Sequence, residues 1–365
     1  MRWNISVRAE KKHVKERTMI IDSNMYWFPE ELFENTELME QFLDEIPGQF
    51  GWYGYCEEIA GKDGLKQIVL EKPKGFQNLN YAQHDYILEN QLKDLDAAGV
   101  EKAVLKVPCC QEWMSLSMCR YFNDRMHEHA EKSDGRLIPL GIVPPYNRQE
   151  NIDELVRCHE ELQVKALQMS AHYGDVYLDD ERFAAFFEKV NEYGMTVYVH
   201  HTPVPAEYHS FYEFNNVRRS YGRCVDQGLA VGRELFSGFF DKYPNIKLVH
   251  SMLGGGFFAL SNMMFPKKAK IETVNRFHSD NGEVEDQFKS HIYFEMSHAQ
   301  PWGKAQLKCA IETLGADHVI FGTSYPVRKE WLLEGADFVK GLDIPEEDKD
   351  LVLGKNAQKI YGIEA

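Results

Sequence analysis

The sequence has little positive charge and no long run of apolar residues. Of its 365 residues, 41 are Lys or Arg and 57 are Asp or Glu, so the formal net charge is −16. Nucleic acids and anionic membrane surfaces attract basic patches, so this balance argues against both as partners. A membrane-spanning helix needs about 18 or more consecutive apolar residues, and no segment reaches that length.

Cysteine is also scarce. Seven cysteines occur, an odd number, and none belongs to a C-x-x-C pair. In a chain of this size the pattern is typical of a reducing compartment, so we expect a cytoplasmic protein whose cysteines act as small apolar residues. The first 18 residues hold six Lys or Arg and lack the apolar core of a secretory signal. We interpret residues 1–18 as an N-terminal arm.

Apolar residues make up 44% of the chain and aromatic residues 13%, which is enough for a packed core. Short apolar runs alternate with charged, amphipathic segments. One such segment, 180–193, places Phe183, Phe186, Phe187 and Val190 at helical spacing. The candidate strands are residues 19–23, 102–107, 137–143, 164–169, 196–200, 247–251, 291–295 and 318–323.

Eight strands alternating with helices predict an α/β fold with parallel pairing, closed into one (β/α)₈ TIM barrel over residues 19–363. An open doubly wound sheet is the alternative. It is disfavoured because no G-x-G-x-x-G turn follows the first strand. The first connection is too long for a simple loop and is rich in aromatic residues. We interpret residues 30–80 as an insertion that caps the catalytic end of the barrel.

Four stretches carry a specific resemblance. They are MIIDSNMYWFP at 19–29, VKALQMSAH at 164–172, YPNIKLVHSMLGGG at 243–256 and LGADHVIFGTSYP at 314–326. In this order they resemble the first, fourth, sixth and eighth strands of the amidohydrolases of the aminocarboxymuconate-semialdehyde decarboxylase type. The resemblance implies a metal-dependent enzyme scaffold, and because relatives are commonly dimers it also implies a homodimer.

The family's metal ligands are mostly replaced in this chain. Asn24 and Tyr26 match the paired histidines of the first strand, and His200 matches the histidine of the fifth. Met252 and Ser324 match the histidine of the sixth strand and the aspartate of the eighth. Catalytic zinc sites use at least three imidazole, carboxylate or thiolate ligands. We therefore expect no metal and no other cofactor.

Other residues are candidates for a site without a metal. A relocated metal site built from His200, His250, Glu295 and His298 is the alternative, but barrel-interior histidines more often bond to one another or to the backbone. Alternation along the fifth strand predicts that His200 and His201 point to opposite sides. We expect the substrate to be bound by six residues, namely Arg218, Arg219, Arg328, His172, Lys106 and Gln168. The arginines would pair with a carboxylate.

Two chemistries fit these residues. In decarboxylation or carbon–carbon cleavage, His200 or Tyr26 protonates carbon while Asn24 and Ser324 donate to an enolate oxygen. In the ring-opening hydrolysis of a lactone or cyclic ketone, His200 activates water instead. A non-catalytic barrel that only binds a ligand is the third interpretation. We favour decarboxylation of a small carboxylated, phenolic or cyclic molecule.

His200 is expected to exchange protons near its ordinary pKa of about 6.5. Glu295 and His298, at the end of the seventh strand, are the further acid/base candidates.

Overall fold

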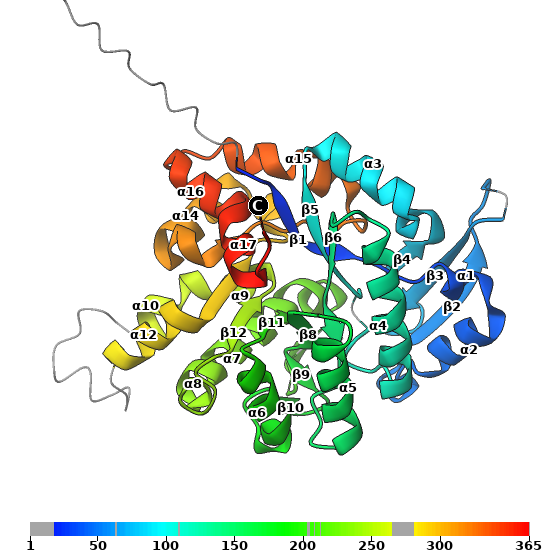
Figure 1. The fold of residues 1–365 in the computed structure, drawn as a ribbon, viewed down its shortest axis with the longest axis horizontal. Coiled ribbons are helices and arrows are strands. Elements are labelled where there is room, and N and C mark those ends of the chain that lie inside the picture. Colours follow the sequence, from blue (N-terminus) through cyan, green and yellow to red (C-terminus); the bar gives the residue numbers. More distant parts are fainter. Residues whose placement is uncertain are drawn as a thin grey trace, which may run out of the picture.

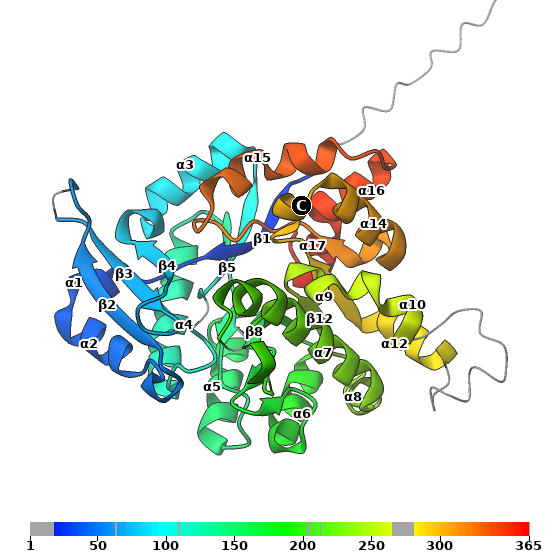
Figure 2. The same ribbon diagram turned by 180° about the vertical axis from the view of Figure 1, so that it is seen from behind.

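The computed structural model describes residues 18–62, 64–108, 110–202, 205–207, 209–211, 213–264 and 281–364. The predicted N-terminal arm lies outside the described residues except for Thr18. None of the helices in these ranges has both the length and the apolar character required to cross a bilayer. Figures 1 and 2 show helices arranged around a set of parallel strands, with the cap segment, in blue, on one flank.

Each of the eight predicted strands is present. They are β1 (Ile21–Tyr26), β5 (Lys102–Lys106), the pair β6 (Leu137–Pro139) and β7 (Gly141–Ile142), β8 (Ala166–Ser170), β11 (Thr196–His200), β12 (Lys247–His250), β13 (Ile292–Glu295) and β14 (Val319–Ile320). Neighbours pair in parallel, in the orders β1-β5-β6 and β7-β8-β11-β12-β13-β14. The third predicted run is divided after Pro139, which has no N–H for the ladder.

Backbone hydrogen bonds join the two sets into a ring. Leu140 N donates to Leu105 O at 3.1 Å, and Ser23 N donates to Phe321 O at 2.9 Å. At the same seam, Met25 bridges to Tyr325 in parallel. On the outer side of this seam, α15 (Lys329–Lys340) lies beside α3 (Leu88–Ala98) in Figures 1 and 2. The predicted (β/α)₈ barrel is confirmed.

Amphipathic helices cover the outside of the ring. The longer ones, besides α3 and α15, are α4 (Leu116–Glu131), α5 (Gln149–Glu160), α6 (Ala184–Tyr193), α7 (Arg223–Phe236), α12 (Asn281–His291), α14 (Lys304–Leu314) and α17 (Asn356–Tyr361). Shorter ones are α8 (Phe239–Lys242), α9 (Met252–Gly256), α10 (Ser261–Met264), α13 (Ala299–Trp302) and α16 (Glu346–Asp350). In α6 the predicted apolar stripe is buried, and Gly194 in the left-handed conformation ends the helix.

The segment interpreted as a cap has secondary structure of its own. Two helices, α1 (Glu31–Glu34) and α2 (Thr36–Asp44), precede an antiparallel sheet of β2 (Tyr53–Glu58), β3 (Lys66–Glu71) and β4 (Gln77–Ala82). Gly54 on β2 allows close packing of the turn after α2, because a Cβ there would lie 2.3 Å from a methyl group of Ile46.

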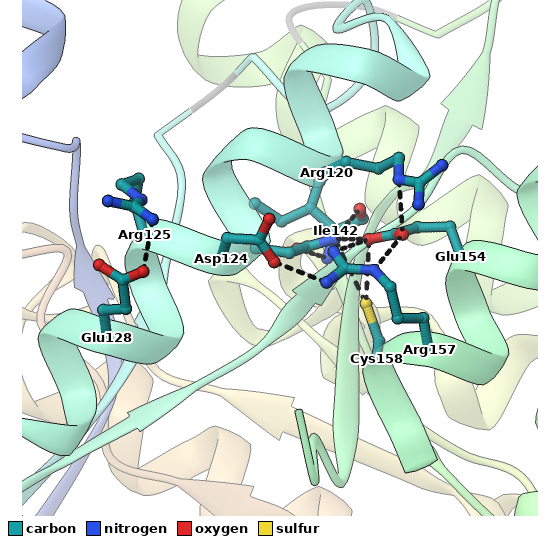
Figure 3. Close-up of polar contacts among 9 residues, drawn as sticks. Arg120, Asp124, Arg125, Glu128, Ile142, Glu154, Arg157 and Cys158 are labelled. Carbon is teal, nitrogen blue, oxygen red and sulfur yellow. Dashed lines mark hydrogen bonds and ion pairs between the residues drawn. The ribbon is translucent and has the colours of Figure 1, made fainter. Parts of the chain in front are cut away.

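A buried ionic network holds α4, α5 and β7 together (Figure 3). Asn123 Nδ2 donates to Glu154 Oε1 at 2.8 Å and to Ile142 O at 3.0 Å, and Ile142 N donates back to Asn123 Oδ1 at 2.8 Å. Arg157 donates two hydrogen bonds to Glu154, at 2.8 and 2.9 Å. The Glu154 side chain is fully buried, so its charge depends on these partners.

The barrel interior has an apolar floor and a polar layer above it. The floor contains Val104, Ala166, Tyr198 and Tyr293, which pack with Ile360 and Tyr361 of α17. Side chains two residues apart on a strand point the same way. The next inward positions on β5, β8, β11 and β13 are Lys106, Gln168, His200 and Glu295, all fully buried. We name these four residues the polar layer. Lys106, His200 and Glu295 are the last residues of their strands, and Gln168 is in the middle of β8. Barrel enzymes carry their active sites at the carboxyl ends of the strands.

Candidate active site at the barrel mouth

His200 and Tyr26 form a hydrogen-bonded pair at the polar layer. The Nδ1 atom of His200 lies 2.8 Å from the carbonyl oxygen of His201, so Nδ1 carries the hydrogen. Nε2 is then an acceptor, and the Tyr26 hydroxyl donates to it at 2.9 Å. Both side chains are buried. The pair joins the first and fifth strands of the barrel in the arrangement of a phenol and a base.

Burial holds the pKa of His200 well below its ordinary value of 6.5, and the positive charge of Lys106 adds to the effect. The imidazole is therefore neutral at pH 7, and the expectation that it titrates near 6.5 is wrong. As the pH falls, His200 is protonated in the unfolded chain at a higher pH than in the folded protein. Neutral His200 thus contributes stability above about pH 6.5 that is lost on acidification.

We expect the side-chain nitrogen shifts of His200 to stay constant between about pH 8 and pH 6, while free histidine in the same tube titrates near 6.5. A nitrogen-detected NMR titration, with the signal assigned by its loss in His200→Gln, measures this. A midpoint between pH 6 and 7 would contradict the geometry of a neutral acceptor.

Glu295 is the carboxylate of the polar layer. Asn24 Nδ2 donates to its Oε2 at 2.9 Å and the Tyr198 hydroxyl donates to the same oxygen at 2.8 Å. Gly322, two residues after the neighbouring strand β14, makes room for it, since a Cβ there would lie 2.2 Å from Glu295 Oε1. Burial raises the pKa of Glu295, and the charge of Lys106 opposes that rise.

Asp22 holds the start of the site to the loop after β14. It accepts hydrogen bonds from Asn24 N at 2.9 Å, from Thr323 N at 3.0 Å and from the Thr323 hydroxyl. Burial raises the pKa of Asp22 to about 6. Ser324, which follows Thr323, has a positive φ of 61° and accepts a hydrogen bond from Asn24 Nδ2 at 3.1 Å. Asn24 and Ser324, predicted together, are therefore in contact.

Lys106 and Gln168 have different roles in the layer. The Lys106 ammonium lies 3.7 Å from the ring centroid of Tyr198 and 4.9 Å from that of Tyr26, so it contacts both rings in cation–π geometry. Gln168 donates to Val107 O and accepts from Val107 N, both at 2.9 Å. Its amide thus holds β8 to the end of β5.

The predicted arginines are placed differently from one another. Arg218 is buried, but one of its nitrogens donates to Lys72 O and to Asn215 Oδ1, both at 2.9 Å. Arg219 is half-buried on the π-helical turn Val217–Gly222. Arg328 is 61% exposed and pairs with Glu330 at 3.7 Å, so the structure does not bring it to the polar layer.

His172 begins the short strand β9 (His172–Tyr173), which follows β8, and His298 lies between β13 and α13. His172 Nε2 is 2.7 Å from the Thr202 hydroxyl and 3.3 Å from Asp226, and its Nδ1 is 2.8 Å from Gly174 O. His298 has a positive φ of 67°. Burial lowers the pKa of His298 to about 3, so it is neutral at pH 7.

Two residues near the polar layer were missed from sequence. His201 was expected to point away from His200, but the two rings stack at 4.2 Å because alternation ends with β11 at His200. Arg223, the first residue of α7, is buried, and its charge contributes to lowering the pKa of His200, His201 and His298. The sequence did carry one indication of this. Arg223 and Asp226 are polar residues three positions apart, so both lie on the buried face of α7.

A cavity of about 760 Å³ lies between the cap and the loops at this end of the barrel. We name it the cap cavity. Its wall includes Phe50 and Trp52 of the cap, Trp113 after β5, Tyr146 after β7, His172 after β8 and Thr202 after β11. The cavity therefore adjoins the site at His172 and Thr202, which are in contact with each other.

Comparison with known proteins assigns the family. Residues 110–363, well over half of the chain, match the sequence profile of the amidohydrolase family. The chain belongs to the amidohydrolase family. It is 24% identical to a 2-amino-3-carboxymuconate-6-semialdehyde decarboxylase of Dictyostelium discoideum, over 68% of this chain and 68% of that protein. It is 23% identical to a γ-resorcylate decarboxylase of Polaromonas sp., over 75% and 87% of the two chains.

Solved structures agree on the fold of this amidohydrolase. A 5-carboxyvanillate decarboxylase of Novosphingobium aromaticivorans with bound manganese superposes with a TM-score of 0.72, at 18% identity, over 96% of this chain and 98% of that one. A dihydroxybenzoic acid decarboxylase of Polaromonas sp. with bound manganese and 2-nitroresorcinol gives 0.68, at 19% identity, over 95% and 97%. The named relatives support an enzyme of the decarboxylase kind, as the sequence predicts.

The residues of this amidohydrolase do not fit the metal that those two structures contain. His200 Nε2, the nitrogen left to bind a metal, accepts from Tyr26. The Asn24 amide directs its hydrogens to Glu295 and Ser324. Within the described ranges, no three His, Cys, Asp or Glu side chains gather in a way that could hold an ion.

The alternative relocated site lacks one of its members. His250 bonds to Glu234 at 2.7 Å and to Gln227 at 2.9 Å, and both partners lie on α7. These bonds use both of its ring nitrogens, so His250 is not available to a shared metal at the barrel mouth.

Proposed function

We propose that this amidohydrolase decarboxylates a small carboxylated phenolic or cyclic substrate without a transition metal. The observation that carries the proposal is the 2.9 Å hydrogen bond between the Tyr26 hydroxyl and His200 Nε2 at the buried polar layer. The names of the relatives, a 2-amino-3-carboxymuconate-6-semialdehyde decarboxylase and a γ-resorcylate decarboxylase, support the reaction class. Fold alone would not, since one fold hosts many reactions.

The proposed step needs one proton and no oxidant. The bond between the ring carbon and its carboxylate breaks, CO₂ leaves, and the electron pair stays on the ring carbon. That carbon takes the proton of the Tyr26 hydroxyl, and a proton from solvent restores the hydroxyl by way of His200 Nε2. The Lys106 ammonium, 4.9 Å from the ring of Tyr26, stabilises the tyrosinate that forms.

The contacts of Asn24 and Ser324 change the roles that the sequence predicts for them in this reaction. Asn24 uses its amide hydrogens on Glu295 and Ser324, so it is not the oxyanion donor expected from sequence. Its Oδ1 is buried without a hydrogen-bond partner among the described residues, and it would accept from a substrate hydroxyl. Ser324, which accepts from Asn24, keeps its own hydrogen for a substrate oxygen.

Turnover that survives removal of metals tests the proposal. We expect protein dialysed against EDTA and then freed of chelator to decarboxylate members of a panel of mono- and dihydroxybenzoates at the untreated rate, measured as CO₂ release. Metal content below about 0.05 per chain is confirmed by elemental analysis, because catalytic metal sites are stoichiometric. The manganese-containing Polaromonas dihydroxybenzoic acid decarboxylase is the control, and it should lose its activity. Activity that returns only with added manganese or zinc contradicts the proposal.

A further inference from the structure

The cap cavity is larger than a one-ring substrate requires. Its volume of about 760 Å³ lies within the range of roughly 300 to 1,000 Å³ that is typical of sites for drug-sized ligands. Aromatic side chains from the cap and from separate barrel loops line it, among them Trp52, Trp113 and Tyr146. Such a wall buries a flat or alkyl group well. The cavity is therefore a candidate site for a part of the substrate that does not react.

The distance from the polar layer sets the geometry of that part. Thr202, on the cavity wall, is two residues beyond His200. Two residues of extended chain span at most about 7 Å. Neither Tyr26 nor His200 is among the described residues that line the cavity, so a ring whose reacting carbon lies at Tyr26 would place only a substituent in it, past Thr202.

The charge of the cavity restricts the substituent further. Its described lining residues include four acids, Asp44, Glu45, Glu112 and Asp175, and no Lys or Arg. Glu112 is 9% exposed, and its carboxylate forms an ion pair with the buried Lys72 ammonium at 3.5 Å. Burial raises the pKa of Glu112. If the substituent ended in a carboxylate, that group would face side chains of the same charge in this cavity.

We propose that the cap cavity binds an uncharged apolar extension of the substrate, so that the natural substrate is a carboxylated phenol or ring with an alkyl or aromatic substituent. The inference rests on the proposed function, because it takes the reacting ring to lie at Tyr26 and His200. Glu112 is the residue that discriminates against substrates with a negatively charged tail. The acid groups come from the cap and from the loops after β5 and β8, so the selectivity depends on their joint placement.

Three product-like probes test the proposal: resorcinol, 4-hexylresorcinol and 6-(2,4-dihydroxyphenyl)hexanoate. Binding is followed by quenching of the fluorescence of Trp52 and Trp113 and by calorimetry. Each buried methylene strengthens binding by a factor of roughly 4, so we expect 4-hexylresorcinol to bind at least about 10²-fold more tightly than resorcinol. The hexanoate should bind at least about 10-fold more weakly than 4-hexylresorcinol, and Glu112→Gln should narrow that difference.

Ala206, on the cavity wall, offers a variant that fills the cavity without touching the polar layer. Ala206→Phe should reduce the preference for 4-hexylresorcinol over resorcinol to below about 10-fold. The new side chain would occupy the space of the hexyl group, whose methylenes would then stay in water. Ala305→Phe, on the exposed face of α14, is the matched control and should keep the preference. Trp52→Ala tests the same wall if Ala206→Phe does not fold.

The outcomes separate this inference from the proposed function. A wild-type preference below about 10-fold, or one unchanged by both cavity variants, overturns the cavity assignment. If such a protein still decarboxylates hydroxybenzoates, only the cavity assignment fails. A strong preference without turnover of any panel member, including alkylated hydroxybenzoates, supports the cavity and overturns decarboxylation.

Discussion

We expect Tyr26→Phe to lower kcat by about 10³-fold, within the range of 10² to 10⁴ that a positioned proton donor contributes. The substitution removes one oxygen atom, which donates to His200 Nε2 at 2.9 Å. The ring remains and still covers Lys106. KM should therefore change little, and the thermal unfolding midpoint should stay within a few degrees. Steady-state kinetics on the best substrate of the panel measure both constants.

His200→Gln should lower kcat by about 10² or more, because the restoring proton then lacks its relay. Tyr26 and His200 act as a unit, so the double variant should be about as slow as the slower single one. Tyr193→Phe is the control, since that hydroxyl donates to Glu160 on the exposed surface. Wild-type turnover by Tyr26→Phe would place the proton donor elsewhere, and Glu295 and His298 would be the next residues to test.

The second large effect concerns stability. We expect Glu154→Ala to lower the free energy of unfolding by about 3 to 5 kcal/mol, the usual cost of removing one partner from a buried ion pair. The substitution takes one acceptor from the buried Asn123 amide, which keeps Ile142 O, and takes two hydrogen bonds from Arg157 (Figure 3). Denaturant unfolding followed by circular dichroism measures the change.

A matched ion pair for comparison lies on α4, the helix that carries Asn123. Arg125 and Glu128 on α4 form an ion pair at side-chain exposures of 33% and 43%. Glu128→Ala should cost less than about 1 kcal/mol, because exposed pairs contribute little. Equal losses in the two variants would show that burial of Glu154 is not what makes its network stabilising.

Much of the fold follows from local sequence pattern. The eight strands were located because short apolar runs alternate with amphipathic segments, and α6 because Phe183, Phe186, Phe187 and Val190 recur at helical spacing. Boundaries depended on single residues. Pro139 divides the third run, and a register shift in β1 between Asp22 and Met25 lies beside the position where Asn24 meets Glu295.

The site followed from sequence only in part. The resemblance pointed to Asn24, Tyr26, His200 and Ser324, and the structure brings them together in two contacts, Tyr26 with His200 and Asn24 with Ser324. The direction in which each hydrogen bond runs is not a property of the residue type. The direction depends on the neighbours of the other polar atoms in the same side chain. In His200, the carbonyl of His201 accepts from Nδ1, and this contact sets the tautomer.

The sequence by itself determined the barrel and the family resemblance, because periodicity and residue identity are local properties of the chain. The replacement of the family's metal ligands is a prediction from that resemblance. Only the tertiary structure decided the protonation of His200, the stacking of His201 on it and the approach of Arg223. Those outcomes depend on burial and on charges that reach the site from β5, α7 and the loop after β13. A pKa is set by the whole surroundings of a group, and the surroundings exist only once the barrel has closed.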